Sequence, residues 1–216
     1  ILGEAASESL ADRAKKLKHC EFSALNQSFA LKKIPEFKCG EYVKTAFCIE
    51  AAPREAEYLK IFNDFKFGGF SPNIPLLTMP VLWDKTRAPE GHCVLNVYNY
   101  APYNLYGDSK NWGTYKQELA DAVWEFTKSM FTNISDDDII GNRWIFDPTD
   151  YEKWNPAFKR GDIALIGMQP DQMYAYRPFV GFGQTYASDI ENLYILGSCS
   201  HPGGGIAASA RAGIQV

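Results

Sequence analysis

Several features that would assign this chain of 216 residues to a particular class are absent from its sequence. No apolar run approaches the roughly 20 residues that cross a bilayer, and no secretory signal is visible. The short basic patch of Lys15, Lys16 and Lys18 is expected on a solvated helix face. Since the formal net charge is −4 and nucleic-acid binding needs a clustered basic surface, we expect no nucleic-acid partner.

Metal-binding and disulfide patterns are absent as well. The five cysteines contain no CxxC pair and match no zinc spacing. The acidic run 136–138 lacks the alternating oxygen donors and distal Glu of a calcium loop. The sequence therefore predicts free thiols, no metal site, and a location in the cytoplasm or another reducing compartment. Peripheral attachment to a membrane is left open.

What is present indicates a folded protein. Hydrophobic residues make up 46% and charged residues 22% of the chain, so we expect a proper buried core. Alternation and helical spacing predict the individual elements. The expected strands are 23–31, 42–49, 76–82, 93–100, 139–146, 163–167 and 192–196, and the expected helices are 7–18, 53–65, 112–131, 147–154 and 206–215. This pattern predicts an α+β fold with a mixed, mainly antiparallel sheet and packed helices, plus a terminal β-turn-α unit.

The terminal unit is the most informative stretch. A compact apolar strand, 192–196, leads into a glycine-rich turn, 197–205, and then into a helix rich in small residues. Glycines allow close approach of a ligand to the backbone, and the positive end of the helix dipole points at the turn. From these residues alone, a cofactor contact and a tight connection without a ligand remain equally open.

The order of the residues in this stretch favours the cofactor contact. Residues 192–205, Asn-Leu-Tyr-Ile-Leu-Gly-Ser-Cys-Ser-His-Pro-Gly-Gly-Gly, closely resemble the C-terminal FAD-contacting motif of phytoene desaturase-type FAD-dependent oxidoreductases. The nearest branch is the one that contains pyridine nucleotide-disulfide oxidoreductase domain-containing protein 2. The similarity extends, more weakly, to other stretches of the chain. These are 161–168, 171–173, Arg177-Pro178, 88–92 and 100–103.

The resemblance implies a division of the chain and a cofactor. Residues 1–190 would form the substrate-binding domain, and 191–216 would be the return segment of a Rossmann-like FAD-binding domain. The N-terminal FAD-binding half, marked in the family by GxGxxG after a strand, is absent. The residues implied to contact FAD are Gly197, Ser198, His201, Pro202, Gly203, Gly204, Gly205 and Ile206. Ala208 and Arg211 depart from the pattern, because glycine is common there in the family.

The implied reaction is hydride transfer from an apolar or amine small molecule to flavin. Tyr100, Tyr103 and Arg177 are candidates for substrate binding, while the catalytic residues remain unknown. We expect His201 to organise the turn or lie beside the flavin rather than act as an acid or base, because hydride removal from an apolar C–H donor requires no protein base. The chain alone would be inactive and would bind FAD weakly at most.

Alternative hypotheses concern partners. The chain could serve as a non-enzymatic binding or interaction module derived from such an enzyme, or as one subunit of a split flavoprotein. A separate N-terminal FAD-domain chain or self-association would then cover its apolar docking surface.

Overall fold

The central strand β1 (Phe22–Leu31) shows how the sequence builds the sheet. Its odd-numbered residues from Ser23 to Leu31 are buried, while most even-numbered residues are half-buried or exposed. Because successive strand side chains point to opposite faces, one face of β1 belongs to the core. β4 (Cys93–Pro102) has the same alternation and pairs with β1 along its whole length, from Phe22↔Pro102 to Leu31↔Cys93.

The computed structural model describes residues 7–51, 53–182 and 185–216. In this part of the chain, five strands form one antiparallel sheet in the order β2-β3-β4-β1-β5. The three shorter strands are β2 (Cys48–Glu50), β3 (Pro75–Thr78) and β5 (Trp144–Phe146). The sheet, with its two helices α2 (Glu55–Phe65) and α3 (Trp112–Ser129), lies within the compact unit Glu21–Asp150.

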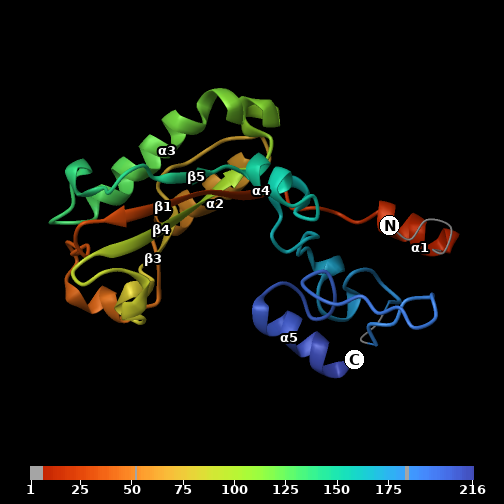
Figure 1. Ribbon diagram of the computed structural model, residues 1–216. Coiled ribbons are helices and arrows are strands. Elements are labelled where there is room, and N and C mark those ends of the chain that lie inside the picture. Colours follow the sequence, from red (N-terminus) through yellow and green to blue (C-terminus); the bar gives the residue numbers. More distant parts are fainter. Residues whose placement is uncertain (1–6, 52, 183–184) are drawn as a thin grey trace. The chain divides into compact units, whose positions relative to one another are not determined.

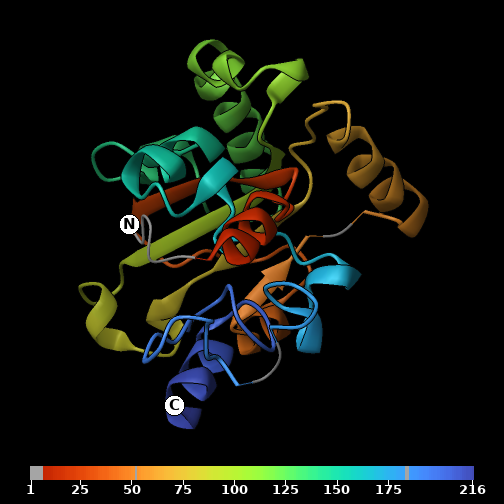
Figure 2. The ribbon, with the colours of Figure 1, turned by 90° about the vertical axis from the view of Figure 1, so that its right-hand side faces the viewer.

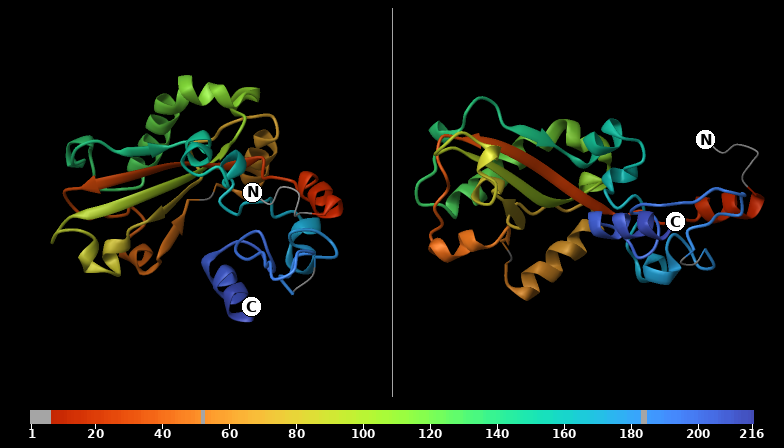
Figure 3. Two further views of the ribbon diagram at one scale, coloured as in Figure 1. Left: turned by 45° about the vertical axis from the view of Figure 1, so that its right-hand side comes forward. Right: turned by 60° about the horizontal axis from the view of Figure 1, so that its bottom comes forward.

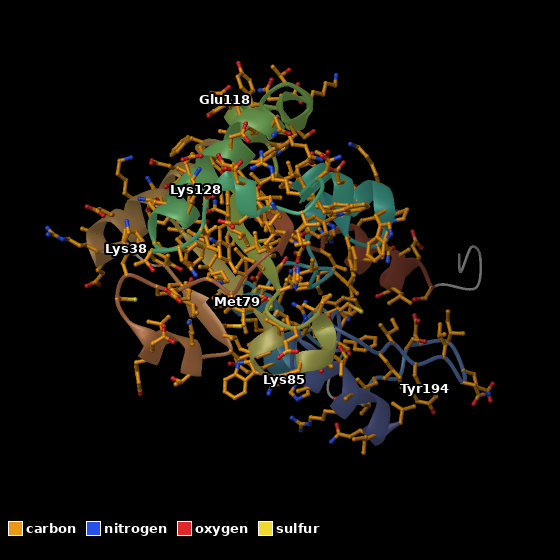
Figure 4. The ribbon with its side chains drawn as sticks, turned by 60° about the vertical axis from the view of Figure 1, so that its left-hand side comes forward. Lys38, Met79, Lys85, Glu118, Lys128 and Tyr194 are labelled. Carbon is orange, nitrogen blue, oxygen red and sulfur yellow. The ribbon has the colours of Figure 1, made fainter. Side chains whose placement is uncertain are left out.

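The two helices cover opposite faces of the sheet (Figures 1 and 3). α3 packs on the odd-numbered face, where the Trp124 ring stacks on Phe29 with centroids 4.3 Å apart. α2 packs on one end of the even-numbered face, where Phe65 stacks on Phe22 at 5.7 Å. The outer side of α3 is polar: Lys128 pairs with Glu125 and Asp136 there (Figure 4). An amphipathic helix with one apolar stripe produces this arrangement.

The second compact unit joins the described residues up to Cys20 with Tyr151–Val216. It contains α1 (Glu8–Lys15) and α5 (Ile206–Gln215) and consists otherwise largely of turns and loops (Figure 2). α1 begins as expected, because the hydroxyl of Ser7 accepts the Leu10 N–H at 3.0 Å. The chain passes between the units through α4 (Pro148–Trp154). The proposed functional division at residue 190 stays a prediction, since compactness alone does not define function.

The α+β class with a mainly antiparallel sheet is confirmed, but some expected strands are wrong. Residues 41–45 form a 3-10 helix, so the strand predicted over 42–49 is reduced to β2. The strand predicted over 76–82 ends at Thr78, and Pro80, which cannot donate to the ladder, opens a 3-10 turn. The strand predicted over 139–146 is reduced to β5 and an isolated bridge from Ile139 to Leu31.

Two expected strands of the second unit are missing from the described residues. Residues 163–167 form turns, because the carbonyls of three of them bind a buried arginine instead of a neighbouring strand. Residues 192–196 make only a single bridge, from Tyr194 to Ala187. Among the residues that the structure describes, the terminal unit thus has its glycine turn and its helix but no paired strand, and a Rossmann-like arrangement is not established.

Candidate functional site

The glycine turn ends where α5 begins, and its backbone has conformations that few other residues adopt. Gly203 has φ +147° and Gly205 has φ +112°, and a side chain would be strained at either. At Gly204 an added Cβ would lie 3.2 Å from Ala164 Cβ and Met168 Sδ, so the close approach there is to the protein itself. At Gly205 an added Cβ would meet nothing within 4 Å, so this glycine faces open space.

A groove of about 750 Å³ lies beside this turn. It is within the size range of small-molecule sites. The residues that line it are Ile163, Ala164, Met168, Ser198, Gly204, Gly205, Ile206, Ser209 and Ala210. The lining is mostly apolar, and Ile206 is 91% exposed. The groove therefore offers an apolar wall of small side chains next to a helix start.

The start of α5 adds a polar element to the groove. The first N–H groups of a helix have no partner within the helix, and Gly205 at the N-cap has no side chain that could satisfy them. Such N–H groups, with the positive end of the helix dipole, favour a partial or full negative charge on a ligand. The groove thus combines an apolar wall with donors at one end.

The structure brings together some of the predicted cofactor residues and separates others. Ser198, Gly204, Gly205 and Ile206 line the groove. Pro202 accepts a hydrogen bond from the Tyr174 N–H through its carbonyl. Gly197 has φ +103° at the entry of the turn, and Gly203 is buried beneath it.

His201 lies inside the second unit, not on the groove wall. Its side chain is 7% exposed, and its buried Nδ1 has no hydrogen-bond partner among the residues that the structure describes. The role expected for His201, to organise the turn or to lie beside the flavin, stays a prediction.

Sequence reasoning missed five of the groove residues as site residues. Ile163, Ala164 and Met168 come from a segment that the family resemblance covers, but a loop of ordinary apolar residues carries no pattern of its own. Ser209 and Ala210 follow Ile206 at i+3 and i+4, so helical periodicity could have placed them on one face.

Tyr100 lies in the other unit, on the even-numbered face of the sheet. It is half-buried and its ring lies 5.8 Å from that of Tyr98, edge to face. Burial raises the pKa of the Tyr100 hydroxyl, and the Glu50 carboxylate raises it further. Burial, a hydrogen bond to Glu50 and the charge of Glu50 raise the pKa of Tyr58 to about 12. Both phenols therefore remain neutral hydrogen-bond donors at physiological pH.

The other two substrate candidates have different surroundings. Tyr103 follows β4, where its N–H donates to Glu21 and its carbonyl accepts from the Trp112 indole. The side chain of Arg177 is completely buried, and all of its donor groups are engaged by backbone carbonyls. This environment gives Arg177 an internal position rather than a place on a surface.

Two kinds of feature are absent from the described residues. In the ranges 7–51, 53–182 and 185–216, no helix is both long and apolar enough to span a bilayer. No group of three His, Cys, Asp or Glu side chains in the same ranges is arranged to hold a metal ion.

Comparison with curated proteins places the chain among relatives of phytoene desaturase-type oxidoreductases. Pyridine nucleotide-disulfide oxidoreductase domain-containing protein 2 from Rattus norvegicus is 31% identical over 156 residues, which cover 69% of this chain and 25% of that protein. A 4,4'-diapophytoene desaturase from Staphylococcus aureus (strain Newman) is 29% identical over 143 residues, 63% of this chain and 26% of that protein. No protein-family model matches the chain.

These matches confirm the family resemblance, and they extend over only part of each relative. They indicate an FAD-dependent oxidoreductase or desaturase family. The chain spans about a quarter of the length of the curated relatives that it matches.

Proposed function

We propose that the chain is the substrate-domain-bearing part of an FAD-dependent oxidoreductase that removes hydride from an apolar or amine substrate. The observation that carries this proposal is the groove beside residues 203–206, which combines an apolar wall with the uncapped start of α5. A bound FAD would supply the acceptor for the hydride. Names of relatives support the reaction class, since one is an oxidoreductase domain-containing protein and another a desaturase.

The residues of the groove suit one wall of a flavin site. Gly205 leaves space in which a planar ring could approach the backbone, and Ile206, Ser209 and Ala210 offer small or exposed side chains along α5. The N–H groups at the start of α5 would face the electron-rich edge of that ring. The adenine and pyrophosphate would be held elsewhere, because GxGxxG is absent from this sequence.

Tyr100 and Tyr103 stay the proposed substrate contacts. Tyr98, Tyr100 and Phe146 present half-buried aromatic side chains on the even-numbered face of the sheet, and Tyr103 follows at the end of β4. Their proposed task is to position the donor carbon and exclude water, which lowers the barrier without a protein base. We assign Arg177 to the turn rather than to direct substrate contact, because its donors are all engaged.

A binding or interaction module is the second candidate. On α5 only Ala212 is buried, while Ile206 and Ile214 are 91% and 84% exposed. Val216, which follows the helix, is 54% exposed. A helix with so little of its apolar surface covered is typical of a docking element. A second chain that carries the FAD domain, or a second copy of this chain, could cover it.

Visible absorbance of purified protein separates these candidates. We expect the isolated chain to be colourless and to bind added FAD weakly, whereas the full product of the reading frame that contains it should purify with a flavin spectrum. A full product that is colourless, and that takes up no FAD on titration, would favour the module. Light scattering on the same samples would show whether the isolated chain self-associates.

A matched pair of substitutions tests the groove itself. Ala210→Trp fills the groove from α5, whereas Ala207→Trp adds the same indole at an exposed position outside the lining. In the full product we expect Ala210→Trp to weaken FAD binding at least about tenfold, which corresponds to about 1.4 kcal/mol, and Ala207→Trp to change it little. Equal FAD affinity of the two variants would contradict the assignment of the groove.

A further inference from the structure

Arg177 has an unusual environment for a charged side chain. It is 0% exposed, and each of its five N–H groups donates to a backbone carbonyl. The acceptors are Ser198 (2.7 Å from Nε), Gly167 and Gln172 (3.1 and 2.9 Å from Nη1), and Ala164 and Ile166 (both 2.9 Å from Nη2). Burial of a charge is costly unless its donors are satisfied. The guanidinium is fully satisfied by peptide dipoles.

No carboxylate in the part of the chain that the structure describes forms an ion pair with Arg177. Burial lowers the pKa of the Arg177 guanidinium, and the charge of the Asp162 carboxylate opposes that shift. The two oxygens of that carboxylate accept the N–H groups of Ala164 and Cys20. The positive charge is therefore held by carbonyls and is not cancelled by direct contact with an anion.

This charge lies directly behind the glycine turn. Arg177 Cδ is 4.0 Å from the position of a Cβ on Gly203, and Arg177 Nε binds the Ser198 carbonyl at the beginning of the turn. The other four contacts hold the segment 164–172, which supplies Ala164 and Met168 to the groove. The side chain of Arg177 thus joins both walls of the groove, and its positive charge lies behind the wall that the glycine turn forms.

We propose that Arg177 is a positioning residue that fixes the glycine turn against the segment 164–172 and keeps a positive potential at the groove. The inference rests on the proposed function, since a ligand with a negatively polarised ring edge or an anionic group would then be preferred next to Gly203–Gly205. The charge of Arg177 and the start of α5 act in the same direction there. Neutral apolar ligands would gain nothing from either.

Cys199 provides a local probe of this potential that needs no cofactor. Its thiol is half-buried, burial raises its pKa, and Arg177 opposes that rise. A chain in which Cys20, Cys39 and Cys48 are replaced by Ser leaves Cys199 and the buried Cys93. The rate of reaction of Cys199 with a disulfide reagent, measured against pH, then reports the thiolate fraction at the turn.

Neither Met nor Lys can donate to all five carbonyls, so both variants lose the tie, but only Arg177→Met loses the charge. If Arg177 supplies the positive potential, Cys199 should react about tenfold more slowly at neutral pH in Arg177→Met than in Arg177→Lys. If Arg177 is only a structural tie, the two variants should react at equal rates. Lys16→Met, which removes an exposed charge of the same unit, serves as the control and should change nothing.

Equal rates in the two variants, or a faster rate in Arg177→Met than in Arg177→Lys, would overturn the proposal. Should Arg177→Met fail to fold, Arg177→Gln takes its place as the neutral variant in the comparison with Arg177→Lys. Because the readout is a thiol rate, a negative result is distinct from failure to bind FAD in the Ala210→Trp experiment.

Discussion

At the scale of single residues, polar side chains often accept backbone N–H groups that have no backbone partner. Asp138 is an example, although its sequence context predicts only a solvated acidic loop. Its carboxylate accepts the Ser135 N–H at 2.8 Å and the Ser135 hydroxyl at 3.0 Å, and it pairs with Lys33 at 3.0 Å. The backbone hydrogen bond from Ser135, more than any other contact, holds the pKa of Asp138 below its ordinary value of 3.8.

The lowered pKa of Asp138 predicts how acid acts on this region. A carboxylate whose pKa is lower in the folded than in the unfolded state stabilises the fold above the unfolded value, and this contribution is lost as the pH falls through the folded pKa. We expect urea unfolding to show that Asp138→Asn is less stable than the parent at neutral pH. Below the ordinary value of 3.8, the difference between the two proteins should shrink.

Asp137→Asn is the control for this prediction, since Asp137 is the exposed neighbour one residue earlier. Its free energy of unfolding should follow that of the parent across the pH series. A constant difference between parent and Asp138→Asn at every pH would show that the contribution of Asp138 does not depend on its ionisation.

At the scale of elements, the sheet face decides which substitutions are costly. Phe29 on β1 is 1% exposed and stacks on Trp124 of α3, so Phe29→Ala should lower the free energy of unfolding by about 3–5 kcal/mol. Ser28, the preceding residue, points to the other face and makes a half-buried hydrogen bond to Asn96. Ser28→Ala should cost no more than about 1 kcal/mol. Chemical denaturation of both variants checks this, and equal losses would refute the assigned faces.

Elements with a strong period of their own were predictable from the sequence. β1, β4 and α3 lie within one or two residues of their expected bounds, because alternation over ten residues or helical spacing over eighteen leaves little ambiguity. α5 occupies the expected residues as well, since the glycine turn marks its start.

The sequence could not reveal contacts that depend on distant residues. Residues 163–167 have the composition of a strand, yet their carbonyls bind Arg177, which no local pattern indicates. For the same reason, the sequence indicated the motif 197–206 and the family resemblance of 161–168, but not that Ala164 and Met168 form the wall of the groove opposite that motif. Periodicity reports which face is buried, not which partner buries it.

At the scale of the whole molecule, the two compact units differ in the number of hydrophobic side chains that they bury. The two hydrophobic clusters found among the described residues lie entirely between Phe22 and Ile145, within the unit Glu21–Asp150. We expect a chain of residues 21–150 to unfold in a single cooperative transition, as domains with their own core do. Thermal unfolding followed by near-ultraviolet circular dichroism would test this.

The complementary expectation concerns the rest of the chain. Among the described residues of 151–216, only a few apolar side chains are buried, those of Ile166, Phe182, Tyr186 and Ala212, so this segment expressed alone should lack a cooperative transition. A broad or absent transition for residues 21–150 would mean that the sheet depends on residues outside it. The second unit would then be part of one folding unit with the sheet.

The pairing of β1 with β4 has a consequence for synthesis of the protein. The two strands form the longest ladder of the sheet, yet Phe22 and Pro102 lie 80 positions apart in the chain. On the ribosome, β1 therefore emerges long before its partner and must wait with both edges unpaired. During that interval the nascent chain exposes Leu25, Phe29 and Leu31, and such exposed apolar surface favours aggregation until Pro102 has left the exit tunnel.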